Sequence, residues 1–189
     1  PLLDDIHRQV TRSWGSHAGH PRTIIELMPD HPRFAVRITG MPDIYTMAVC
    51  HGPLIVMEVP RRGIPSEHFG PYDWARVLRH EYTHTITLAR TNYHIPHWLT
   101  EAAAVDMERA PRSLDTCLML AGATTTNTLF NLDEIRWAFI RPEKPHHRAL
   151  AYAQSHWMLQ FIQNTCGNDA VQKLLDTYAR GTREVHALP

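Results

Sequence analysis

The stretch His80-Glu81-Tyr82-Thr83-His84 decides how the rest of this chain is interpreted. On a helix, His80 and His84 would lie one turn apart on the same face, where two imidazole nitrogens could reach one metal ion. Glu81 would project from a neighbouring part of that face, close enough to contact a water bound to the metal. Two histidine ligands beside a carboxylate that acts as general base are typical of zinc hydrolases. The pentapeptide therefore predicts a zinc site on a helix.

The segment that follows offers a third ligand. Catalytic zinc sites combine three protein ligands with one open position. Glu101 would lie on a second helix, after a loop at residues 91–96 in which Pro96 suits the helix start. The small residues Ala102-Ala103-Ala104 favour a helix and let a neighbouring helix approach closely. His94 and His97 are alternative ligands. A third histidine at position 90 is excluded, because that residue is Arg90.

The order of these pieces resembles a known family. The pattern H-E-x-x-H followed by P-x-W-L-x-E-x-x-A is similar to the gluzincins, in particular the peptidase MA-like family. A later signature is matched by Ala151-Tyr152-Ala153-Gln154-Ser155 and then by Cys166-Gly167, so the resemblance spans roughly residues 74–181. It implies a helical zincin catalytic core, similar to that of thermolysin. It also implies one Zn²⁺ ion held by His80, His84 and Glu101, with Glu81 as general base.

Two positions depart from the family pattern. Ala102 stands where the family usually has glycine, and Val105 stands where thermolysin-like relatives have an aspartate. That aspartate would be the carboxylate that orients a histidine ligand. Asp106 and Asp73 are the candidates for this role here.

The predicted chemistry needs further side chains. Glu81 would accept a proton from a zinc-activated water and pass it to the leaving amine. The resemblance places Tyr152 where its hydroxyl could donate to the oxyanion, and a core aromatic is the alternative reading. His156 lies one turn further on and is the next candidate donor. Glu58 stands on a predicted strand, where aminopeptidase relatives hold a glutamate that binds the substrate amine. The neighbouring glycine and asparagine of that motif are absent here, and a strand-edge carboxylate is the alternative.

Composition excludes several other classes of protein. The chain of 189 residues carries 19 basic and 19 acidic side chains, which argues against nucleic acid as a partner. It has no apolar stretch of about 20 residues that could span a membrane. Its three cysteines have no metal-type spacing and are expected as core thiols. Because it opens on Pro1, we expect an excised piece of a longer protein, with further domains of the parent chain as partners.

Periodicity and turn residues predict an α+β fold in one domain, residues 1–189. Residues 20–60 would be strand-rich and form a small, mostly antiparallel sheet. The catalytic helices would occupy residues 71–181. The expected elements are as follows: a helix at 2–14, strands at 24–28, 34–39, 45–50 and 54–59, a loop at 61–70, and helices at 71–90, 97–109, 112–122, 131–140, 148–166 and 169–180.

These observations together predict zinc-dependent hydrolysis of peptide bonds, with a peptide or protein as substrate. The predicted strand 54–59 could be a sheet edge on which an extended substrate pairs. The alternative is a catalytically silent zinc-binding or interaction domain that keeps a peptidase fold. The presence of Glu81 argues against it, because a binding domain needs no general base.

Overall fold

A computed structural model describes residues 2–16, 22–42, 44–59 and 72–182. The described chain divides into two compact units, residues 1–90 and 91–189, and each is treated by itself. The first unit contains α1 (Leu2–Trp14), β1 (Ile24–Met28), α2 (His31–Thr39), β2 (Ala48–His51), β3 (Leu54–Glu58) and α3 (Trp74–Arg90). The second contains α4 (His97–Glu108), α5 (Leu114–Thr125), α6 (Leu132–Ile140), α7 (His147–Cys166) and α8 (Asn168–Ala179). The predicted α+β class is confirmed.

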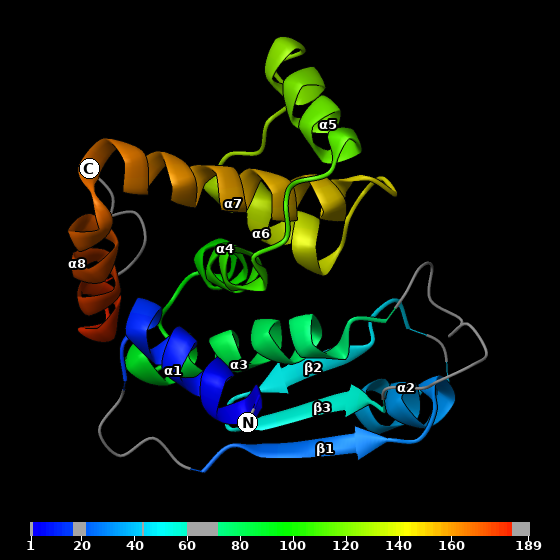
Figure 1. The fold of residues 1–189 in the computed structure, drawn as a ribbon. Coiled ribbons are helices and arrows are strands. Elements are labelled where there is room, and N and C mark those ends of the chain that lie inside the picture. Colours follow the sequence, from blue (N-terminus) through cyan, green and yellow to red (C-terminus); the bar gives the residue numbers. More distant parts are fainter. Residues whose placement is uncertain (1, 17–21, 43, 60–71, 183–189) are drawn as a thin grey trace. The chain divides into compact units, whose positions relative to one another are not determined.

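The sheet of the first unit has the strand order β1-β3-β2 (Figure 1). β3 pairs antiparallel with β2, and it pairs parallel with β1. The sheet is therefore mixed, whereas a mostly antiparallel sheet was expected. β3 is also the central strand, so the expectation that residues 54–59 form a free edge for a substrate is wrong. Its side chains Ile55, Val56 and Met57 are at most 1% exposed, as a strand covered on both faces requires.

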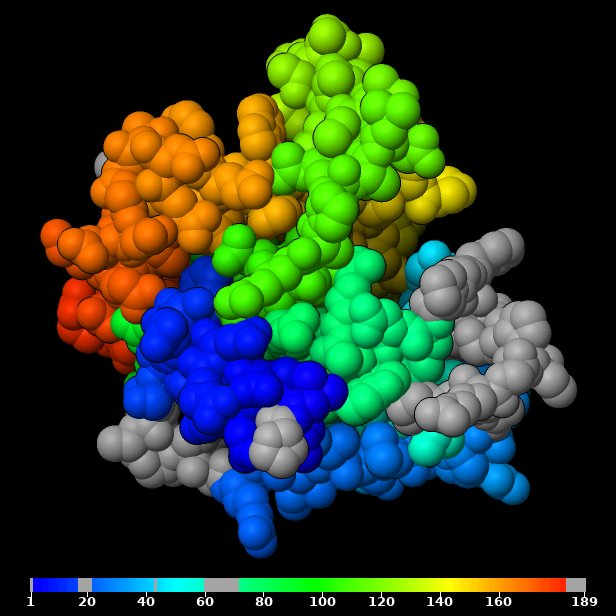
Figure 2. Space-filling model, viewed as in Figure 1, coloured from blue at the N-terminus to red at the C-terminus, as the bar shows by residue number. Residues whose placement is uncertain are grey.

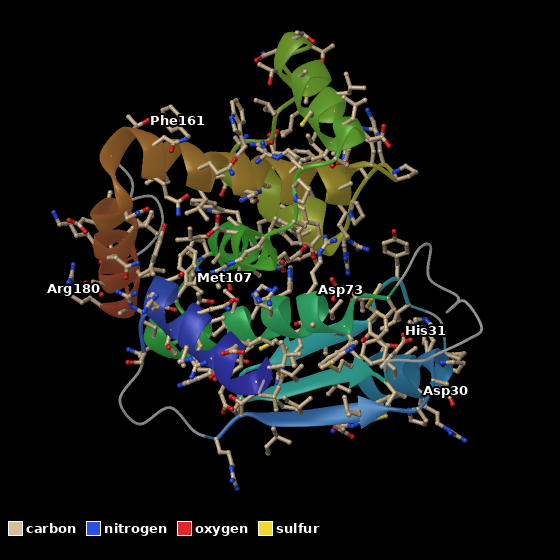
Figure 3. All side chains as sticks on the ribbon, viewed as in Figure 1. Asp30, His31, Asp73, Met107, Phe161 and Arg180 are labelled. Atoms are coloured by element: carbon tan, nitrogen blue, oxygen red, sulfur yellow. The ribbon has the colours of Figure 1, made fainter. Side chains whose placement is uncertain are left out.

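The parallel pairing of β1 with β3 follows from α2, and here the prediction of a strand at residues 34–39 is wrong. Asp30 caps this helix, because its side chain accepts a hydrogen bond from the Arg33 backbone amide at 2.9 Å. Pro32 lies in the first turn, and Gly40 ends the helix with a φ of 79°. Asp30 and His31 mark the start of α2 in Figure 3. Residues 30–32 are therefore the start of a helix.

Helix α3 covers the sheet face opposite α2. The Sγ atom of Cys50 lies 3.3 Å from the hydroxyl of Thr85 on α3. Cys50 pairs with Ile55 in the antiparallel register, so both side chains point to α3. Glu58 points the other way, because side chains alternate along a strand, and it contacts His31 of α2.

Helix α1 packs on α3 and is at the surface in Figure 2. Its Ile6, Val10 and Trp14 recur at helical spacing and are at most 2% exposed, as predicted. His7 Nδ1 lies 2.6 Å from the Tyr82 hydroxyl of α3. At the other end of α3, the Arg90 guanidinium donates to the Trp14 backbone carbonyl at 2.7 Å. These contacts fix α3 between α1 and the sheet.

The second unit is built around α7, which contacts α4, α5, α6 and α8 (Figure 1). Gln154 of α7 is buried, and its side-chain amide pairs with the backbone of Phe130. The Gln154 Oε1 atom accepts from Phe130 N at 2.9 Å, and its Nε2 atom donates to Phe130 O at 2.6 Å. This double hydrogen bond joins the loop before α6 to the centre of α7.

Helix ends deviate from prediction where a capping residue decides them. α3 begins at Trp74, because the Asp73 side chain accepts from the Arg76 amide at 3.1 Å; the predicted start at Pro71 lies outside the described residues. Asp73 is marked at this helix start in Figure 3. The predicted loop 61–70 also lies outside them. α5 runs two to three residues later than predicted, because Ser113 caps it. The prediction of core thiols is wrong for Cys117 and Cys166, which are exposed. Cys50 is half-buried.

Candidate metal centre

His80 and His84 lie one turn apart on α3, as their spacing predicts. Their Nε2 atoms are 3.2 Å apart, and their ring planes are inclined by 77°. Both rings therefore present the same nitrogen to the same point. Without a metal, one Nε2–H would donate to the lone pair of the other ring.

Glu81 is buried at 8% exposure on the same helix. Its negative charge acts on Tyr72, whose phenol has a pKa raised far above its usual range. Burial is the main cause, and the negative charges of Glu58 and then Glu81 add to it. The Glu81 carboxylate therefore lies close enough to the Tyr72 phenol to act on its ionisation. The side chain is shielded from solvent, in agreement with the apolar residues beside it on the same helix face.

Tyr72 and Glu58 form a second polar group beside the first unit's sheet. The Tyr72 hydroxyl donates to the Glu58 backbone carbonyl at 2.9 Å. The Glu58 carboxylate accepts from His31 Nδ1 at 2.6 Å, and both side chains are largely buried. The structure therefore gives Glu58 an internal partner, His31, at the end of β3. The role of Glu58 toward a substrate amine stays a prediction.

Glu101 lies on α4 of the second unit and is buried at 8% exposure. His97, one turn earlier, places its Nε2 atom 3.1 Å from Glu101 Oε1. An ionised carboxylate has only acceptor atoms, so the imidazole N–H is the donor. His97 is thus beside Glu101. His94, the other alternative ligand, is exposed in the loop before α4.

Tyr152 is half-buried on α7. Its ring meets Phe139 of α6 edge-on, with ring centroids 5.0 Å apart and an interplanar angle of 89°. Phe139 in turn contacts the His97 ring at a centroid distance of 4.7 Å. One aromatic ring therefore separates Tyr152 from the histidine that contacts Glu101.

His156 belongs to a different polar group of the second unit. Its Nδ1 atom lies 3.3 Å from an Arg112 nitrogen, and Arg112 also donates to Gln160 at 2.7 Å. Its Nε2 atom lies 3.6 Å from Asp106 Oδ1. Asp106 and Asp73 are the two carboxylates predicted to orient a ligand histidine. In the structure, Asp106 lies beside His156. Asp73 caps α3.

Sequence reasoning missed three of these relationships. The contacts of Tyr72 and His31 with Glu58 left no pattern in the sequence, because the partners are distant along the chain. The contact of His97 with Glu101 had a signal, since residues four apart on a helix are neighbours. Within the described part of the chain, the group of side chains that could bind a metal ion is His80, His84 and Glu101.

Comparison with known families gave one match. The model of the Peptidase MA superfamily matches residues 64–188, well over half of the chain. The chain therefore belongs to the Peptidase MA superfamily, and its fold is metallopeptidase-like. Comparison with curated proteins gave no match, and comparison with solved structures gave none either.

None of the helices in the described residues is both long enough and apolar enough to cross a membrane. The family points to a protein as substrate.

Proposed function

We propose that this chain is a zinc metallopeptidase, in which His80, His84 and Glu101 hold one Zn²⁺ ion and Glu81 is the general base. The substrate is a peptide or protein, and the reaction is hydrolysis of a peptide bond.

The observation that carries this proposal is the geometry of the histidine pair. A tetrahedral zinc ion with Zn–N bonds of about 2.0–2.1 Å holds two nitrogen ligands about 3.3–3.4 Å apart. The Nε2 atoms of His80 and His84 are 3.2 Å apart, close to that spacing. Two imidazoles and a carboxylate are also a ligand set that zinc hydrolases use.

Glu101 is the third ligand in this proposal for three reasons. It is a carboxylate buried on α4, and carboxylates are among the protein ligands that zinc accepts. Only residues 91–96 connect its helix to α3. The chain's membership of the Peptidase MA superfamily supports a metal centre built from both helices.

When bound, zinc supplies a Lewis acid that makes water acidic near neutral pH and polarises a carbonyl group. Glu81 would take the proton of the attacking water and return it to the amine that leaves. Its buried position suits this role, because a base shielded from bulk water keeps the proton within the site. The hydroxyl of Tyr152 would donate to the carbonyl oxygen as negative charge develops on it.

The test separates metal binding from chemistry. Glu81→Gln preserves the size of the side chain and removes its ability to accept a proton. We expect the variant to keep the metal content of the parent and to lose peptide hydrolysis by about 10²-fold or more. Glu143→Gln, in an exposed loop of the second unit, is the matched control and should keep both properties.

Metal content is measured after purification, and hydrolysis is measured on a peptide library. A parent chain that binds zinc but cleaves nothing would favour the catalytically silent domain. Full activity in Glu81→Gln would show that another group is the base. Loss of metal in this variant would show that Glu81 is a ligand.

A further inference from the structure

One metal-ligand candidate has a hydrogen-bond donor of its own. His97 and Glu101 are one turn apart on α4, and Nε2 of His97 lies 3.1 Å from Oε1 of Glu101. The Glu101 side chain is 10% exposed and that of His97 is 38% exposed. The donor therefore reaches from the rim of the unit to a buried carboxylate.

The imidazole of His97 is itself held in place. The ring of Phe139 packs against it at a centroid distance of 4.7 Å and an interplanar angle of 37°. Phe139 is 6% exposed, and it also makes an edge contact with Tyr152. A histidine held between a buried ring and a carboxylate has few other rotamers open to it.

We propose that His97 is a positioning residue that fixes the orientation of the Glu101 carboxylate for metal binding. This inference rests on the proposed function, in which Glu101 is a zinc ligand. A ligand that binds through one carboxylate oxygen leaves the other oxygen for a hydrogen bond. That bond restricts rotation about the last side-chain torsion and lowers the entropy lost when metal binds.

The structure favours positioning over direct ligation by His97. Its Nε2 atom carries the proton that Glu101 accepts, and a nitrogen that carries a proton has no lone pair for a metal. Direct ligation through Nε2 would require this hydrogen bond to break. Within the described residues, the group whose ligand atoms lie within 4.8 Å of one another is His80, His84 and Glu101, and His97 is not part of it. His97 therefore acts through Glu101.

The test compares zinc affinity in four chains of residues 1–189: the parent, His97→Ala, His97→Gln and His146→Ala. Glutamine keeps an N–H donor at a similar reach, whereas alanine removes it. His146 is exposed at the start of α7 and is the control for loss of a histidine. Affinity is measured by competition between the chain and a chromophoric zinc chelator, and circular dichroism checks that each chain is folded.

We expect His97→Ala to bind zinc about 10- to 100-fold more weakly, as loss of a residue that orients a ligand typically does. His97→Gln should recover most of the affinity, and His146→Ala should match the parent. The absorption spectrum of the Co²⁺-loaded chain should have the same shape in the parent and in His97→Ala, because the ligands are unchanged.

The outcomes separate this inference from the function on which it rests. A parent chain that binds no zinc would overturn the proposed function. A parent that binds zinc, with unchanged affinity in His97→Ala, would overturn only the positioning role. A changed Co²⁺ spectrum in His97→Ala would identify His97 as a ligand instead, and so would contradict positioning. If His97→Ala does not fold, His97→Gln decides the outcome. An affinity of His97→Gln as low as that of the ligand variant His84→Ala would contradict the proposal.

Discussion

The Nε2 atoms of His80 and His84 lie 3.2 Å apart on one face of α3. Two imidazoles at this separation either share one hydrogen bond or bind one ion. The first arrangement needs only the helix, whereas the second also needs a third donor, for which Glu101 is the candidate. The two arrangements therefore predict different effects of substitutions on metal binding.

Replacement of either histidine should abolish stoichiometric zinc binding. We expect His84→Ala to lose zinc during purification, because two ligands hold the ion far less tightly than three. Metal analysis of the purified chain measures this directly. His51→Ala, an exposed histidine at the end of β2, is the control and should retain the parent's zinc content. Undiminished zinc in His84→Ala would exclude His84 as a ligand.

Tyr152→Phe tests the proposed donor to the oxyanion. If the hydroxyl acts only as charge develops, kcat should fall by about 10²- to 10³-fold, with little change in KM. The ring that contacts Phe139 is retained, so zinc content and melting temperature should stay near those of the parent. If turnover is unimpaired, Tyr152 is a packing residue, and His156→Ala becomes the next variant to measure.

The phenol of Tyr72 reports on the charge of Glu81. Its pKa is raised above the ordinary 10.0, first by burial and then by Glu58 and Glu81. Glu81→Gln should therefore lower the pKa of Tyr72 without restoring the ordinary value. Absorbance titration of tyrosinate in Glu81→Gln and in the parent, each with and without Tyr72→Phe, isolates this transition. An unchanged Tyr72 transition in Glu81→Gln would contradict the proximity of the two groups.

The same shift predicts how stability depends on pH. Tyr72 is harder to ionise in the folded chain than in the unfolded chain, where the ordinary value of 10.0 applies. Its contribution to stability is therefore fully present below about pH 10 and declines as pH rises further, because the unfolded state releases its proton first. Tyr72→Phe should reduce this loss at alkaline pH. Urea denaturation at pH 9 and at pH 11 measures the difference.

Gln154 should contribute to stability rather than to chemistry. Gln154→Leu leaves the partly buried N–H and carbonyl of Phe130 without their partner, at a cost of about 1–3 kcal/mol. Gln163→Leu makes the same change at a half-buried position of the same helix, and should have a smaller effect. Chemical unfolding of the two variants compares them. Equal unfolding midpoints would mean that the Gln154–Phe130 pair adds nothing.

The parts of the fold that sequence predicted are those with long, regular periodicity. Helices α1 and α7 were placed to within a residue or so, because their apolar spacing is sustained. Helix α2 was missed, because Asp30 and Pro32 suit a turn as well as a helix start. The choice between them depends on burial of Phe34 and Ala35, which the chain settles only when folded.

The candidate site divides in the same way. The relative positions of His80, Glu81 and His84 were predictable, because a spacing of four residues on a helix places the two histidines on one face. Tyr72 and His31 were not, because their contacts join segments brought together by the sheet. Glu101 was chosen from its helical context and the family pattern. Its role as a ligand is a prediction.

Helix α3 places its two histidines among residues that form the first unit's core. Leu78 and Ile86 are at most 3% exposed, and Thr85 contacts Cys50 of the sheet. Anything that loosens this helix from the sheet would also disperse the histidines, so metal occupancy and folding should be thermodynamically linked. Zinc at 100 times its dissociation constant would add about 2.7 kcal/mol to the free energy of unfolding. Melting curves with zinc and with a chelator would then differ, and in the cell the lifetime of the folded chain would follow the supply of the ion.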